Sequence, residues 1–250
     1  MISTWYFGVI AVVLAVGVAI VSVHLARALV SMERLRRHNE IAAPIHATVG
    51  VIYAVLLAFV VIVVWERFND AEQAVIEEAD ELIGLARDVT TLDDRGGEPF
   101  RACLRNYARW VQDVEWEEME KGVVPHVGNR FHDSLWSMLA AIEPGSLRGE
   151  VWLQAAVRRM NAVEDARGRR LLAVESTVPD AMWILLICGG LIIIVFAAFF
   201  GAEHALTHMI MVSALAALVA FSLFLIAAID QPFSGVVRVE NEAFRHVFIE

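Results

Sequence analysis

Charged residues are absent from four long stretches of the chain, which cover residues 1–26, 41–65, 181–202 and 205–229. A bilayer core about 30 Å thick is crossed by roughly 20 helical residues at about 1.5 Å each, so every stretch is long enough to span it. Backbone groups in lipid need hydrogen-bond partners within their own segment, which favours helices over strands. The pattern predicts four transmembrane helices.

The region 66–180 is polar, and its apolar residues recur every three or four positions, as in amphipathic helices. The first series continues the second span, so we expect one helix to pass from the membrane into this region. The second begins after Pro99, and the third ends before Pro144, where Ser146 can cap a further helix. The series are Phe68, Ala71, Val75, Ala79 and Leu82; Phe100, Leu104, Tyr107, Val111 and Val114; and Phe131, Leu135, Leu139 and Ile142.

These patterns predict an all-α integral membrane protein with four transmembrane helices in two hairpins and a helical extramembrane domain between spans two and three. Pro44 is expected in the first turn of the second span, where its missing N–H costs little. The expected divisions are a first hairpin at 1–65 with spans at about 5–28 and 42–65, the acidic domain at 66–180, a second hairpin at 181–230 and a C-terminal tail at 231–250.

The charge of the chain lies mostly in the polar region. The whole chain carries 30 acidic and 20 basic residues, and 23 of the acidic and 14 of the basic residues fall within 66–180. An acidic exterior argues against nucleic acid as a partner, and the lipid bilayer is the partner that the composition predicts. The two cysteines, Cys103 and Cys188, lie in different environments and predict neither a disulfide nor a zinc cluster.

Basic residues cluster on one side of the first hairpin. Arg27, Arg34, Arg36 and Arg37 follow the first span, whereas no Lys or Arg precedes it. Short basic loops remain in the cytoplasm, so we expect both termini and the domain 66–180 on the outer side of the membrane.

The second span is the least lipid-like of the four. Small residues recur at Ala47, Gly50, Ala54 and Ala58, a stripe that allows another helix to approach closely. A second set, His46, Gly50, Tyr53 and Leu57, shares a helix face. Polar groups in hydrocarbon face protein or water, so these residues are candidates either for lining a pore or for ordinary contacts between helices.

Other features are weaker as sites. The acidic run 115–120 could attract cations, but acidic residues at consecutive positions point in different directions and favour a solvated helix face. Glu203, His204 and His208 could supply metal ligands near one helix turn, yet no further ligand is assignable, so no metal is predicted. No phosphate loop, nucleophile elbow or paired-carboxylate motif is present, which disfavours an enzyme, and no cofactor is predicted.

Several segments together resemble the Bestrophin-like family of bacterial membrane proteins. They cover almost the whole chain, although Ala43-Pro44 departs from the glycine expected after the Asn-Glu pair. The resemblance also singles out candidates at the membrane edges: Asn39, Glu40, Asp230, Pro232 and Phe233. The matching segments are His38-Asn39-Glu40, Val49 through Phe59, Trp65-Glu66, then Trp116, Met119 and Gly122, Pro179 and Trp183, and Asp230-Gln231-Pro232-Phe233-Ser234-Gly235.

The resemblance implies a homo-oligomer in the bacterial inner membrane and, by distant analogy, an ion channel that passes inorganic ions. The acidic exterior favours cations over anions. The alternative is a non-conducting sensor or assembly protein, in which the helical domain binds a partner or ligand and the spans serve as anchors.

Overall fold

The computed structural model describes residues 2–92, 97–125 and 129–248, and these are helical or irregular, with no strand among them. The loop expected at Asp93-Asp94-Arg95-Gly96 lies outside the described residues. The chain divides into two compact units, the first formed by 1–65 and 178–230 and the second by 66–177 and 231–250. The all-helical prediction is confirmed for the part of the chain that the structure describes.

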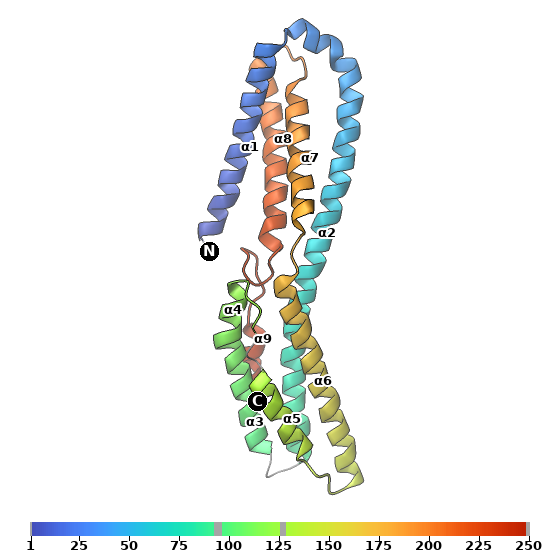
Figure 1. Ribbon diagram of the computed structural model, residues 1–250, viewed down its shortest axis with the longest axis vertical. Coiled ribbons are helices and arrows are strands. Elements are labelled where there is room, and N and C mark those ends of the chain that lie inside the picture. The colour runs from blue at the N-terminus through green and yellow to red at the C-terminus, as the bar shows by residue number, and fades with distance from the viewer. Residues whose placement is uncertain (1, 93–96, 126–128, 249–250) are drawn as a thin grey trace. The chain divides into compact units, whose positions relative to one another are not determined.

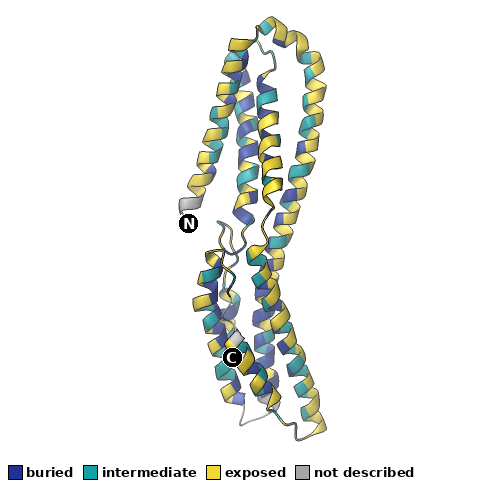
Figure 2. Cartoon of the chain, in the orientation of Figure 1, coloured by how far each residue is buried: buried dark blue, intermediate teal, exposed yellow. Residues whose placement is uncertain are grey.

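Unit 1 contains α1 (Ile2–Leu29), the first part of α2 (Met32–Leu92), α7 (Asp180–Ala198) and α8 (Ala205–Ile229) (Figure 1). All four helices are long and apolar enough to cross a membrane. Their outward surfaces are apolar, as in α1 and the first part of α2, which appear mostly exposed in Figure 2. The core contains small side chains that let helices approach closely, among them Ala19, Ala197, Ala198 and Ala216.

Helix α2 is 61 residues long, about 92 Å at 1.5 Å per residue, and continues without a break from unit 1 into unit 2. The continuation of α2 beyond Trp65 is as expected, but the position at which α2 begins is not. The loop expected between the first two spans is helical from Met32 onward, so Pro44 lies inside α2 rather than in its first turn. Proline removes one backbone hydrogen bond there, and α2 is curved over its first turns (Figure 1).

Unit 2 is built from the second part of α2, α3 (Gly97–Trp110), a π-helix (Val111–Glu115), α4 (Trp116–Glu120), α5 (Asn129–Ala140) and α6 (Leu147–Glu175). Ser146 caps α6 as predicted, because its Oγ accepts a hydrogen bond from the Gly149 amide at 3.1 Å. The segment after Gln231, expected as a separate tail, belongs to this unit and includes α9 (Glu242–Arg245) and a 3₁₀ turn (His246–Phe248).

Candidate functional site

Tyr53 ties α2 to α7 within unit 1. It is buried, and its hydroxyl donates a hydrogen bond to the carbonyl oxygen of Leu186 at 3.1 Å. Its ring lies against Gly189 and Gly190, where an added Cβ would come within 2.8 Å of the ring and 2.9 Å of the hydroxyl oxygen, respectively. Leu57 is half-buried against the same core. The inward face of α2 therefore depends on a glycine pair in α7 that the sequence analysis did not single out.

Gly50, in contrast, is not a close-contact position within one chain. A Cβ at this residue would meet nothing within 4 Å. Gly50 is half-buried, whereas Ala47, Ala54 and Ala58 are exposed, and Val51 continues their stripe at helical spacing. Unit 1 thus leaves a strip of small apolar residues on α2 uncovered.

His46 lies in an aromatic setting at the other end of the inward face. Its imidazole is stacked on Phe196 with ring centroids 5.3 Å apart, and it meets the edge of Phe200 at 5.4 Å. Close by, His208 is buried and its Nε2 lies 3.1 Å from the carbonyl oxygen of Ala197. Both histidines line a cavity of about 240 Å³. Their contacts are those of residues held between helices.

Two of the three side chains considered as metal ligands have different surroundings. Glu203 pairs with Arg36 at 2.9 Å on the surface, whereas His208 is buried among the helices. Among the described residues, no group of three His, Cys, Asp or Glu side chains is arranged to hold a metal ion.

A buried cluster of charged residues occupies the core of unit 2. The guanidinium of Arg170, fully buried, donates to Glu78 at 2.6 and 3.1 Å and to Glu115 at 2.7 Å. Arg167 pairs with the second oxygen of Glu115, and the Tyr107 hydroxyl donates to Glu78 at 2.6 Å. Two arginines therefore balance two carboxylates, which is what allows such charges to remain inside a protein.

The electrostatics of this cluster follow from burial and charge. Burial alone would lower the pKa of Arg170, but the charges of Glu78 and Glu115 and the hydrogen bonds to Glu78 outweigh it and hold the pKa above its usual value. Burial, followed by the charge of Glu78, raises the pKa of Tyr107 well above its usual value. Arg170 is thus held charged and Tyr107 neutral.

The π-helix explains why Glu115 faces the core. Sequence periodicity places Val114 on the apolar face, and this prediction is wrong, because Val114 is 41% exposed. The wider π turn at Val111–Glu115 brings Glu115 and Trp116 inward instead, with Met119 following one turn later. The solvated-face interpretation of the acidic run is accordingly wrong for Glu115.

The comparisons with known proteins agree with one another. The family model described as the Bestrophin-like domain matches residues 13–244. The chain belongs to the Bestrophin-like family. Among solved structures, it is similar to a bacterial bestrophin homolog from Klebsiella pneumoniae, in three single-substitution variants. The first variant has a TM-score of 0.73 at 12% identity, over 96% of this chain and 96% of that chain. The second variant has a TM-score of 0.74 at 11% identity, over 96% and 97% of the two chains. The third variant has a TM-score of 0.74 at 13% identity, over 98% and 95% of the two chains.

No curated protein sequence matches the chain. At identities this low, the structural likeness establishes the bestrophin fold and nothing finer. Together with the four apolar helices, family membership makes the chain a membrane protein.

Two motif residues of this Bestrophin-like chain join the ends of the hairpins in unit 1. Asn39 exchanges two hydrogen bonds with the backbone of Gly201, in the loop between α7 and α8. At the opposite end of these two helices, the Asp230 carboxylate accepts a hydrogen bond from the Val178 amide at 2.8 Å. Glu40, the neighbour of Asn39, is exposed.

Other motif residues lie in unit 2. Phe233 is buried and meets the edge of the Trp116 indole, with ring centroids 5.6 Å apart, while Pro232 accepts a hydrogen bond from the Val239 amide at 2.8 Å. Met119 places its sulfur 2.9 Å from Nη1 of Arg170. Met119 thus brings part of the Bestrophin-like motif into contact with the buried charged cluster.

Proposed function

We propose that the chain is one subunit of a homo-oligomeric ion channel whose pore is lined by the exposed strip of α2. The observation that carries the proposal is the strip itself, formed by Ala47, Val51, Ala54 and Ala58. Inward-facing positions of α2 pack in the core of unit 1, whereas the residues of the strip are exposed, and they allow helices of several copies to approach a common axis. Family membership supports the same function, because bestrophin homologues are oligomeric ion channels.

The proposed pore wall is apolar, so conduction depends on whether water fills it. Narrow apolar constrictions gate by losing water. Tyr53 and Leu57 lie on a different face of α2 from the strip. They stabilise the pore wall by packing α2 against the other helices of its own subunit. The net charge of −10 favours cations near the pore entrance.

Cysteine accessibility during current recording tests the lining. In a background with Cys103 and Cys188 replaced by serine, Ala54→Cys should be blocked by a hydrophilic thiol reagent applied to purified protein in planar bilayers. The control is Ala214→Cys, at an exposed position of α8, whose current should not change. Equal behaviour of the two variants would place the pore elsewhere. Reconstituted protein that stays silent in several salts would favour the sensor or assembly protein.

Assembly is tested separately from conduction. A large side chain at Gly50 has free space within one chain, so Gly50→Leu should leave the subunit folded. If the α2 helices of neighbouring copies meet near this position, the variant will yield smaller particles by mass measurement in detergent. An unchanged oligomer mass would show that this part of α2 faces open space or lipid.

We further propose that the chain lies in the bacterial inner membrane with unit 2 on the outer side, as the arginines after the first span favour. Gly145 is exposed in unit 2, and a Cβ there has free space. In the cysteine-free background, Gly145→Cys should react with a membrane-impermeant thiol reagent in intact cells. Reaction only after the membrane is opened would reverse the orientation.

A further inference from the structure

Two histidines of unit 1 line the same cavity, which has a volume of about 240 Å³. His46 comes from α2, and His208 comes from the first turn of α8. The His46 ring contacts the rings of Phe196 and Phe200, and Nε2 of His208 lies 3.1 Å from the carbonyl oxygen of Ala197. Both imidazoles are therefore held against the same short segment, 196–200, at the end of α7.

The hydrogen bond to Ala197 determines which nitrogen of the neutral His208 ring carries the proton. A carbonyl oxygen can only accept, so Nε2 donates and Nδ1 keeps its lone pair. His208 is 6% exposed, and its Nδ1 atom is buried and has no hydrogen-bond partner among the described residues. Histidine ligands of metal ions have this arrangement, in which one ring nitrogen donates to a backbone carbonyl and the other binds the metal.

The Nδ1 atom of His46 is in the same situation. It is buried and has no hydrogen-bond partner in the part of the chain that the structure describes. Nearly all buried polar atoms in proteins are hydrogen-bonded, so two unpartnered nitrogens at one cavity indicate a ligand-binding site. Both Nδ1 atoms are inaccessible to water. Metal ions bind imidazole nitrogen at about 2.0–2.1 Å, which is closer than a hydrogen-bonded water molecule approaches.

Met211 supplies a third donor atom, its thioether sulfur, at the same cavity. It follows His208 by three positions on α8, so the two side chains are neighbours on one face of the helix. Because the third donor is a methionine, this site is compatible with the lack of a three-residue cluster of His, Cys, Asp or Glu in the described part of the chain. The lining is completed by apolar side chains: Ala197, Phe200, Val212 and Leu215.

The donor set favours a soft ion of low charge. Mg²⁺ and Ca²⁺ take oxygen ligands, and none of the described lining residues has a side-chain oxygen. Zn²⁺ bound by neutral ligands alone would leave two positive charges among apolar side chains, where uncompensated charge is costly. Thioether ligands select Cu(I), and imidazole also binds copper. We propose that His46, His208 and Met211 bind one Cu(I) ion in each chain.

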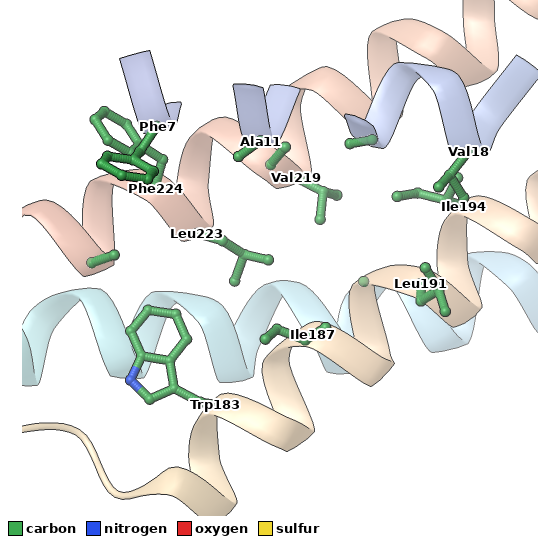
Figure 3. A pocket seen from close by; sticks show the side chains of 14 residues that line it. Phe7, Ala11, Val18, Trp183, Ile187, Leu191, Ile194, Val219, Leu223 and Phe224 are labelled. Atoms are coloured by element: carbon green, nitrogen blue, oxygen red, sulfur yellow. The ribbon is translucent and has the colours of Figure 1, made fainter. Parts of the chain in front are cut away.

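Unit 1 has a larger cavity, of about 400 Å³, among α1, α7 and α8, and its chemistry is different (Figure 3). Its lining is apolar apart from the indole nitrogen of Trp183, which can only donate a hydrogen bond. No described residue of this lining has an imidazole, thiol, thioether or carboxylate group. The larger cavity therefore offers no side-chain ligand for Cu(I).

Copper titration of the purified full chain in detergent tests the site without any measurement of current. The parent protein has Cys103 and Cys188 replaced by serine, because thiolates also bind Cu(I). Under anaerobic conditions with ascorbate, it should take up one Cu(I) per chain from a chromophoric Cu(I) chelator. X-ray absorption of the copper-loaded protein should show both nitrogen and sulfur ligands.

Two pairs of variants in this background locate the site. Met211→Leu and His46→Leu should each weaken the Cu(I) affinity at least tenfold, because loss of a group that only supports a ligand already costs about 10–100-fold. The matched controls are Met209→Leu, on α8 but outside the cavity lining, and His24→Leu, at an exposed position of α1. Both controls should keep the affinity of the parent protein.

Met211→Leu keeps the test independent of folding, because Met211 is 66% exposed and leucine has a similar volume. The X-ray absorption spectrum of this variant should lose its sulfur ligand. The proposal would be overturned by a parent protein that takes up no Cu(I), by a parent spectrum with nitrogen ligands alone, or by equal affinities in Met211→Leu, His46→Leu and the two controls.

Discussion

Asn39 and Gly201 exchange two hydrogen bonds: the Asn39 side-chain nitrogen donates to the Gly201 carbonyl oxygen at 3.0 Å, and the Gly201 amide donates to the Asn39 side-chain oxygen at 2.9 Å. One amide side chain thereby satisfies both backbone groups of a loop residue 162 positions away. Gly201 cannot be replaced easily, because an added Cβ would come within 2.8 Å of the Leu35 carbonyl carbon. The first helical hairpin is held to the second at this point.

Asn39→Ala should lower the free energy of unfolding by about 1–3 kcal/mol, since each hydrogen bond contributes about 0.5–1.5 kcal/mol and the Gly201 backbone loses both partners. Thermal unfolding of the purified protein in detergent measures the change. His38→Ala, at the exposed neighbouring position, is the control and should have almost no effect. Equal unfolding temperatures for both variants would contradict a stabilising role for this contact.

Gly190→Ala should destabilise unit 1. The new Cβ would lie 2.8 Å from Val219 and 2.9 Å from the Tyr53 hydroxyl, and overpacking of this kind costs about 1–3 kcal/mol. Gly17→Ala is the matched control, because a Cβ there has free space within 4 Å and alanine is the better helix former by about 1 kcal/mol. The two variants should therefore shift the unfolding temperature in opposite directions. A shift of the same sign in both would count against close contact between α2 and α7.

Arg170→Met should be among the most destabilising single substitutions in unit 2, with an expected loss of about 3–5 kcal/mol, because Glu78 keeps a buried charge that loses its main partner. Arg169→Met removes only an exposed pair with Glu77, so it should cost no more than about 1 kcal/mol. Chemical unfolding followed by circular dichroism compares them.

The double variant Arg170→Met, Glu78→Gln removes one charge of each sign and leaves Glu115 paired with Arg167. It should recover much of the stability lost in Arg170→Met, since no unpaired carboxylate remains at these positions. Failure to recover any stability would indicate that the shape of the Arg170 side chain, rather than the balance of charges, explains the stability lost in Arg170→Met.

Tyr107 should make the protein sensitive to alkali. Its pKa is raised in the folded state, so the stability it provides is complete below the usual tyrosine value of about 10 and is lost as the pH rises above that value, where the unfolded chain releases the proton first. Tyr107→Phe should lower stability at pH 7, because the bond to Glu78 is lost, yet its stability should fall less steeply above about pH 10. Unfolding midpoints measured from pH 7 to 11 test this difference, and parallel pH profiles would refute it.

The sequence predicts the membrane helices well because their signal is additive. Each uncharged stretch repeats the same evidence over more than 18 residues, and each contains a long apolar helix in the structure. The extension of α2 past Trp65 follows from the same periodicity. The start of α2 does not follow from the sequence, because arginines and a proline near 32–44 indicate a loop as readily as a helix that curves.

The remaining features depend on distant partners, which a single sequence does not reveal. Arg170 stands in a charged region where solvation is the usual state, and only its contacts with Glu78, 92 positions away, show that it is buried. The same holds for Gly189, which is one of many small residues in an apolar span until the Tyr53 ring is placed beside it. Whether a charge is buried and how closely two helices approach each other both depend on pairs of residues that lie far apart in the sequence.

The five-residue π-helix at Val111–Glu115 also affects how this chain is compared with others. A turn of this kind holds one residue more than an α-helical turn. A relative that closes the same turn with α geometry will therefore be one residue shorter here, and its correct alignment needs a single-residue gap between Val111 and Trp116. An ungapped alignment would pair Glu115 with a surface position, and a functional role transferred across it would be assigned to the wrong residue.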